Sequence, residues 1–309
     1  KMQGDWQAAL GATVRVPHLF WMSMKGEAKR DYPASIGYQS PWHAQYKIIE
    51  DHFARLNTAL TRGKPVVKIG VIHPIESYWL HFGPAEQTNA IRERMDKQFH
   101  DLAEILLFHG MDFDYICENE LPYFCHQGGN PLQVGEMRYE VIIVSGCETL
   151  RRTTLERLQK FTDEGGCLII IGDGPKYLDA EPACELEPLY KKGKVIAFNE
   201  TSILESLEPY RFLEIRRGDG SREDRILHQL RKDGEDFWLF LVTGKNPECQ
   251  DIDDGLDVRL ALKGQWKVTL YDTLTGKIYP MPTSYRNENT VIERTWYIHD
   301  SMLLKLQRT

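Results

Sequence analysis

Residues 139–145, with the sequence YEVIIVS, decide the fold of this chain, together with CLIII at residues 167–171. Both runs are apolar at consecutive positions, which is typical of strands buried on both faces of a parallel sheet. Between them, Thr153 and Glu156 have the spacing of a capping box at the start of a helix, and Gly165 stands where that helix would end. The stretch therefore predicts a strand–helix–strand unit.

The same rhythm extends toward both ends of this stretch. Residues 66–72, 113–117 and 194–198 are further short apolar runs. Gly83 and Pro84 open a long helix, because proline is favoured at the first helical position. The apolar stripe of this helix consists of Ile91, Met95, Phe99, Leu102 and Leu106, and Gly110 ends it. Alternating strands and helices predict an α/β domain with a doubly wound parallel sheet of flavodoxin or class I glutamine-amidotransferase type.

After about residue 215 the pattern changes to short strands separated by turns. Asp233–Gly234, Lys263–Gly264 and Thr275–Gly276 are the turn signals. The strand candidates are residues 226–229, 237–243, 256–262, 266–272, 290–296 and 302–306. This pattern predicts a small antiparallel β-sandwich, with Gly218–Asp219–Gly220 as the linker before it.

Residues 1–64 differ from the rest of the chain. A short apolar strand is expected at residues 16–21 and a helix at residues 46–60. One strand and one helix cannot enclose a core, so this segment has to pack on another part of the protein. The expected domains are therefore residues 1–64, 65–217 and 218–309.

Composition excludes several classes of function. The 309 residues carry a formal net charge of -7 with a pI near 5.8, which argues against a nucleic-acid partner. No long apolar run predicts a membrane span, and no signal-peptide pattern opens the chain. The six cysteines form no CxxC pair, which favours reduced thiols in a cytoplasmic protein. Cys125–His126 fits no zinc spacing, so no metal site is expected.

The expected carboxyl ends of the strands carry few signs of chemistry. Residues 73–77 (HPIES) have no glycine-rich phosphate cradle, so no flavin, dinucleotide or other cofactor is expected. Cys147 could be a nucleophile or a small buried turn residue, and the absence of a basic neighbour in sequence favours the second interpretation. Asp173 stands at the elbow where an amidotransferase would need its cysteine, and a carboxylate cannot replace that thiolate.

The segment from residue 16 to residue 42 combines aromatic rings with carboxylates and basic groups. Such a mixture suits sugars, whose C–H faces stack on rings while their hydroxyls need donors and acceptors. A charged surface loop held by Arg–Asp pairs is the alternative interpretation.

The run HLFWMSMKGEAKRDYPASIGYQSPWHAQYKIIEDHFARLNTALTRGKP (residues 18–65) resembles a stretch of large bacterial glycoside hydrolases, including α-L-rhamnosidase-like enzymes. The following VVKIGVIHPIES (residues 66–77) resembles them as well. Residues 140–175 are similar to the amidotransferase-like domain that follows the catalytic barrel in such enzymes. The trimerisation domain of one β-galactosidase family is the best-known relative of that domain.

This resemblance implies that the chain is the non-catalytic C-terminal region of a multidomain glycoside hydrolase. Residues 1–64 would then be the tail of a (β/α)8 barrel or a linker arm, and the catalytic carboxylates of the barrel would lie outside this chain. The longer protein would act on a carbohydrate and could form a homo-oligomer, while this chain alone would be inactive. Candidate residues at the rim of the sugar site are His18, Trp21, Glu27, Arg30, Asp31, His73 and Glu76. An independent oligomerisation module and an amidotransferase-like thiol enzyme are the alternatives.

Overall fold

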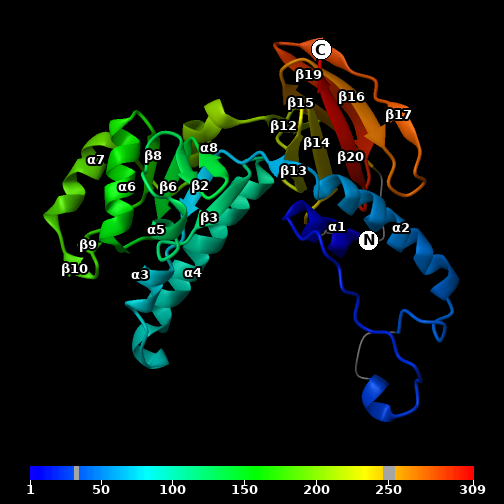
Figure 1. Ribbon diagram of the computed structural model, residues 1–309, viewed down its shortest axis with the longest axis horizontal. Coiled ribbons are helices and arrows are strands. Elements are labelled where there is room, and N and C mark those ends of the chain that lie inside the picture. Colours follow the sequence, from blue (N-terminus) through cyan, green and yellow to red (C-terminus); the bar gives the residue numbers. More distant parts are fainter. Residues whose placement is uncertain (31–34, 246–254) are drawn as a thin grey trace. The chain divides into compact units, whose positions relative to one another are not determined.

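A computed structural model describes residues 1–30, 35–245 and 255–309 (Figure 1). The chain divides into two compact units. The α/β unit comprises Val67–Phe212, and the β unit combines Lys1–Val66 with Leu213–Thr309. The first and last segments expected from the sequence thus belong to one unit, which the chain leaves and re-enters.

The α/β unit is built on a five-stranded sheet in which all neighbouring strands are parallel. In spatial order its strands are β11 (Lys194–Ile196), β8 (Cys167–Ile171), β6 (Val141–Ser145), β2 (Ile69–Ile72) and β3 (Phe113–Ile116). The prediction of a parallel sheet from the two apolar runs is therefore confirmed.

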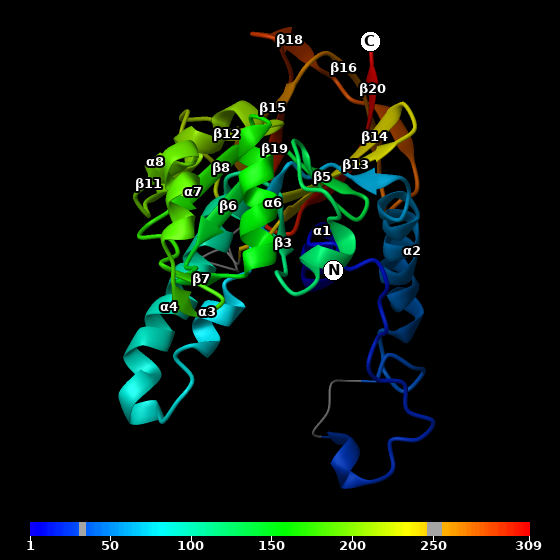
Figure 2. The ribbon, with the colours of Figure 1, turned by 60° about the vertical axis from the view of Figure 1, so that its left-hand side comes forward.

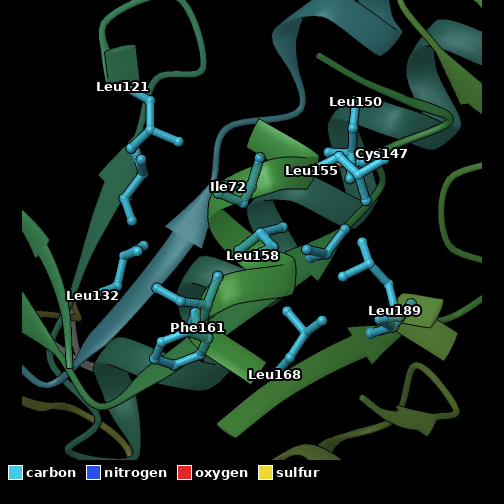
Figure 3. Packing of buried hydrophobic residues seen from close by; sticks show 14 of the residues in the cluster. Ile72, Leu121, Leu132, Cys147, Leu150, Leu155, Leu158, Phe161, Leu168 and Leu189 are labelled. Atoms are coloured by element: carbon cyan, nitrogen blue, oxygen red, sulfur yellow. The ribbon is translucent and has the colours of Figure 1, made fainter. Parts of the chain in front are cut away.

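Helices cover both faces of this sheet because successive strand residues point to opposite sides. Val141 and Ile143 of β6 pack with α4 (Ala85–Phe108) and α8 (Glu200–Leu207). Ile142 and Val144 pack with α6 (Arg152–Asp163), α5 (Leu121–Phe124) and α7 (Glu187–Lys192), and Figure 3 shows Leu158 and Phe161 of α6 inside this second cluster. No helix in the described part of the chain is long and apolar enough to cross a membrane.

Short elements complete the α/β unit. They are α3 (Ile75–Trp79), the hairpin of β4 (Leu132–Val134) and β5 (Met137–Tyr139), the 3-10 helices η2 (Cys184–Leu186) and η3 (Glu208–Tyr210), and the small sheet of β7 (Thr149–Leu150), β9 (Tyr177–Leu178) and β10 (Glu181–Pro182).

The start of α6 differs from the expected capping box. The hydroxyl of Thr153 is buried without a hydrogen-bond partner among the described residues. Instead, Glu118 accepts the backbone N–H of Arg151 at 2.8 Å, and Asp179 accepts that of Arg152 at 3.0 Å. The capping-box prediction was wrong because two carboxylates distant in sequence already satisfy the first N–H groups.

The β unit contains two antiparallel sheets, as the turn pattern predicted. The six-stranded sheet has the order β1 (Lys64–Pro65), β13 (Ile226–Asp233), β14 (Asp236–Thr243), β20 (Ser301–Arg308), β16 (Trp266–Tyr271) and β17 (Ile278–Pro280). The four-stranded sheet has the order β12 (Leu213–Arg217), β15 (Leu256–Lys263), β19 (Asn289–Trp296) and β18 (Ser284–Arg286).

The two helices of the first 66 residues pack on these antiparallel strands. Here α1 (Met2–Ala9) and α2 (His43–Leu60) are joined by a buried side-chain network. His52 contacts Asp5 at 2.5 Å through Nε2 and Thr273 at 2.8 Å through Nδ1. The pairing of β1 with β13 adds a further tie. Both helices of the N-terminal segment therefore share the core of the β unit.

Two details of the β unit differ from expectation. Residues 16–21 form no strand. The sequence Gly218–Asp219–Gly220, expected as a linker, lies in a turn inside the unit. Beside this turn Arg217 binds Glu223 at 2.7 Å and Asp224 at 2.8 Å, which fixes the turn to the next stretch of chain.

Candidate functional site

A cavity of about 210 Å³ lies at the carboxyl edge of the parallel sheet. Three strands bring polar side chains to it: His73 follows β2, Tyr115 lies near the end of β3, and Ser145 ends β6. Phe99 from α4 contributes an aromatic wall. The remaining polar residues that line the cavity include Tyr78, Asp96 and Gln98.

The cavity lies where the winding of the sheet reverses. Strand β2 comes first along the chain, β3 was added on one side of it, and β6 was added on the other. The connections from these strands diverge and leave a crevice outside their carboxyl ends, which is where open α/β sheets bind ligands. The residues named above come from these three strands and the neighbouring helices.

Three rings form the inner wall of this cavity. Tyr115 stacks on Phe99 with ring centroids 4.9 Å apart, and His73 meets both rings edge-on at 5.5 Å. Burial lowers the pKa of His73 and raises the pKa of Tyr115 to about 12. Both side chains are therefore neutral at pH 7, and the wall carries hydrogen-bonding groups without formal charge.

Glu76, one of the predicted site residues, has a structural partner. Its carboxylate binds Arg151 at 2.7 Å and ties α3 to the start of α6. Glu118 is buried close to this pair, and burial raises its pKa to about 7 despite the hydrogen bond from the backbone of Arg151. Glu76 is therefore neither freely solvated nor available as an isolated carboxylate.

Cys147 has the environment of an inert thiol. The residue is 3% exposed, and its Sγ lies 3.7 Å from the carbonyl oxygen of Ser145. Burial raises the pKa of the thiol, and the carboxylates of Glu118 and Glu76 add to the effect. A thiol that stays protonated at neutral pH is a poor nucleophile. The side chain of Asp173, at the elbow after β8, is 93% exposed.

The predicted rim residues of the N-terminal segment lie in the β unit. His18 is exposed, whereas Trp21 is half-buried with the Lys29 ammonium 5.5 Å from its ring centre. Glu27 and Arg30 bound a 3-10 helix, η1 (Glu27–Arg30), and Asp31 lies outside the described residues. Because His73 and Glu76 belong to the α/β unit, the expected proximity of the two groups stays a prediction.

We call the described part of residues 12–42, between α1 and α2, the arm. Figures 1 and 2 both draw its first half in dark blue as an extended chain away from the strands of its own unit. Its apolar side chains are strongly exposed: Val14 by 80%, Val16 by 86%, Phe20 by 60% and Met22 by 91%. The arm therefore buries little of its apolar surface within this chain.

A second cavity, of about 530 Å³, lies in the β unit beside α2, β14 and β16. Four of its charged groups form two ion pairs, since Arg62 binds Asp233 at 2.5 Å and Lys305 binds Asp236 at 2.7 Å. Across the described ranges there is no group of three or more His, Cys, Asp or Glu side chains that could hold a metal ion.

Comparison with known proteins shows which solved structures have a similar architecture. No protein-family model matches the sequence, and no curated protein matches it either. Among solved structures, the rhamnosidase from Novosphingobium sp. PP1Y superposes with a TM-score of 0.62 and 16% identity, covering 90% of this chain and 26% of that one. The β-galactosidase from Bacillus circulans sp. alkalophilus gives a TM-score of 0.54 and 11% identity, covering 87% of this chain and 46% of that one.

A catalytic mutant of Gan42B, a GH42 β-galactosidase from G. stearothermophilus, gives a TM-score of 0.53 and 12% identity, with coverage of 84% and 44%. The chain thus spans between about a quarter and a half of the length of these structures. Its mixed α/β fold, with one parallel sheet and antiparallel sheets, is shared with parts of glycoside hydrolases.

Proposed function

We propose that this chain is the non-catalytic C-terminal region of a multidomain glycoside hydrolase, and that its arm packs against the catalytic barrel. The observation that carries the proposal is the exposed apolar surface of the arm, from Val14 to Met22. Burying a side chain of this size stabilises a protein by roughly 1.5–3 kcal/mol, so four exposed ones favour a partner surface. The shared fold with a quarter of a rhamnosidase chain supports the same proposal.

Within this proposal, the α/β unit is an amidotransferase-like domain of flavodoxin type. The strand order supports this class, because the first strand lies between the second and the third, with the fourth and fifth beyond. The buried Cys147 and the exposed Asp173 favour a supporting role over thiol chemistry. A thiol enzyme would instead release ammonia from glutamine and lose this activity in Cys147→Ala.

The first test is the coding sequence upstream of Lys1. A reading frame that continues into a (β/α)8 barrel supports the proposal, and an initiation codon directly before Lys1 contradicts it. The isolated chain should hydrolyse neither aryl α-L-rhamnosides nor aryl β-D-galactosides. Turnover by the isolated chain would contradict the non-catalytic role.

The second test addresses the arm. In the longer protein, Val16→Asp and Met22→Asp should weaken the association of barrel and C-terminal region, because each places a charge in an apolar contact. Ile278→Asp in β17 is the matched control, since Ile278 is also exposed, at 57%, but lies outside the arm. Equal effects of all three variants on thermal unfolding would contradict a specific contact through the arm.

An independent oligomerisation module makes a different prediction. The isolated chain would then self-associate without any barrel, and arm variants would dissociate it. Light scattering on the isolated chain and on Met22→Asp distinguishes this alternative from the proposed packing on a barrel.

A further inference from the structure

Three large apolar side chains are exposed together at one end of the α/β unit. Trp79 is 60% exposed, Leu80 44% and Phe82 83%, and they stand at the end of α3 and in the short connection to α4. We call these three residues the tip. His81, which lies between them in sequence, binds Glu148 at 2.8 Å. The tip therefore offers apolar contacts without a charged side chain of its own.

The first half of α4 extends this surface. Its 24 residues span about 36 Å at 1.5 Å per residue, whereas a strand of five residues spans only about 17 Å. Figures 1 and 2 both draw α3 and the first turns of α4 beyond the ends of the strands. The buried residues of α4 begin at Leu102, while Ile91 and Met95 of its apolar stripe are only half-buried. The helix thus continues past the surface that covers it within this unit.

The backbone of the tip is anchored to the rest of the unit, although its side chains are uncovered. The hydroxyl of Ser77 in α3 accepts the backbone N–H groups of Glu148 and Thr149 at 2.8 and 3.1 Å. The N–H of Phe82 donates to the carbonyl oxygen of Trp79 at 3.0 Å. Docking a partner would therefore cost little backbone entropy. Exposed apolar clusters of this kind are typical of interaction sites.

The size of the tip limits the kind of partner. A buried aromatic side chain covers about 150–250 Å², so the three partly exposed tip residues offer roughly 300–500 Å². A stable complex between free proteins needs about 800 Å² on each partner. The tip alone is therefore too small to hold a free protein or a second copy. A partner in the same polypeptide has an effective concentration of about millimolar and needs less contact.

Longer proteins with a similar fold contain such a partner. This chain covers only 26% of the rhamnosidase chain and 46% of the β-galactosidase chain from Bacillus circulans, so more than half of each lies outside the matched part. We propose that the tip docks on an apolar surface of the catalytic barrel of the same polypeptide, as a second contact besides that of the arm. This inference rests on the proposed function, because the barrel is the partner.

Hydroxyl-radical footprinting with mass spectrometry tests whether the tip is covered. Trp79 and Phe82 should be oxidised about tenfold or more slowly in the longer protein than in the isolated chain, because covering one such side chain favours the docked state by at least that factor. Tyr123 is the exposed control, since it is 71% exposed in the same unit and should react equally in both. Tyr139, at 4% exposed, should stay protected in both and reports that both are folded. Equal oxidation of the tip in the two proteins would overturn the inference.

Variants of the longer protein give a second measurement. Phe82→Asp should raise the oxidation rate of Trp79 about tenfold, because it places a carboxylate in an apolar contact. Tyr123→Asp is the matched control and should leave Trp79 protected. Neither variant should change the circular dichroism of the isolated chain, since both positions are exposed. Protection of Trp79 that persists in Phe82→Asp would contradict docking through the tip.

Three outcomes separate this inference from the proposed function. If a barrel precedes this chain and Phe20 and Met22 of the arm are protected while the tip is not, only the inference fails. If no barrel precedes it, both fail. Protection of Trp79 that grows with the concentration of the isolated chain would assign the tip to a second copy and would also overturn the inference.

Discussion

Strand β6 of the α/β unit and the arm of the β unit carry similar apolar side chains but bury them very differently. Residues Val141 to Ser145 are between 0% and 5% exposed, whereas Val14, Val16, Phe20 and Met22 are between 60% and 91% exposed. The first run finds its partners within this chain, in the helices on both faces of the sheet. An apolar run in the sequence therefore indicates burial, but not where the covering surface comes from.

The largest expected effect tests the buried side of this comparison. Phe161→Ala should lower the free energy of unfolding of the α/β unit by about 3–5 kcal/mol, because it removes a ring from a closed core. Phe161 is 0% exposed, whereas Phe20 in the arm is 60% exposed. Phe20→Ala, measured in the same urea titration, should change stability by less than about 0.5 kcal/mol. Similar losses in both variants would break the comparison.

A smaller effect concerns the loss of stability that comes from burying the carboxyl group of Glu118 in the α/β unit. The pKa of Glu118 is raised from 4.5 to about 7, so the folded protein holds this proton more tightly than the unfolded chain. Between these values folding takes up a proton, and stability falls as the pH rises. Glu118→Gln keeps an acceptor for the Arg151 N–H, so it should flatten this slope and stabilise the chain at pH 8 by about 2–3 kcal/mol. If the stability of Glu118→Gln falls with pH as steeply as that of the parent chain, the raised pKa of Glu118 would be contradicted.

A third prediction tests whether α1 and α2, unlike the arm, are held in place by the buried network of Asp5 and His52. Burial alone would raise the pKa of Asp5, but the hydrogen bond from His52 and the charge of Lys1 outweigh it and hold the pKa below its usual value. The stabilisation is therefore present above the ordinary pKa and is lost as the pH falls through the lowered one. Asp5→Asn should destabilise the β unit by about 1–2 kcal/mol at pH 7.

The same variant should differ less from the parent chain as the pH falls below 3.8 and through the lowered pKa of Asp5, because the parent carboxylate then takes up its own proton. Thermal unfolding across this range measures the convergence. A difference that stays constant with pH would show that the network acts through packing and not through charge.

The smallest expected effect on stability belongs to the exposed side of the comparison. Met22→Ser should leave the unfolding free energy within about 0.5 kcal/mol of the parent value, because little apolar surface is buried there. The binding of a dye that reports exposed apolar surface should nevertheless decrease. A loss of stability without a change in dye binding would mean that Met22 is covered in solution.

The regular elements were predictable where one local pattern decides the structure. Residues 141–145 and 167–171 could hardly be anything but buried strands, and the paired turn glycines located the antiparallel strands. Residues 16–21 are also mostly apolar, but a strand needs a neighbour to receive its hydrogen bonds. No local pattern states whether that neighbour exists.

The candidate site was predictable only in part. The sequence pointed to His73 because it follows the first strand of the sheet, and it is one of the residues that line the cavity. Phe99 was expected only as part of the apolar stripe of its helix, and Tyr115 was not singled out, although it stands near the end of a predicted strand. Their stacking arises from contacts between distant positions, which strand and helix periodicity cannot reveal.

The division of the β unit between the two ends of the chain constrains how it forms. Strand β1 pairs with β13, so everything between Pro65 and Arg231 is a loop that has to be closed before that pairing exists. During synthesis the α/β unit is complete before the ribosome has made the strands that α1 and α2 need. Closure of so long a loop costs little more than closure of a short one, since each doubling of loop length adds only about 0.6 kcal/mol. During this interval the apolar faces of α1 and α2 stay exposed to solvent and can aggregate, because the strands that cover them lie in the last third of the chain.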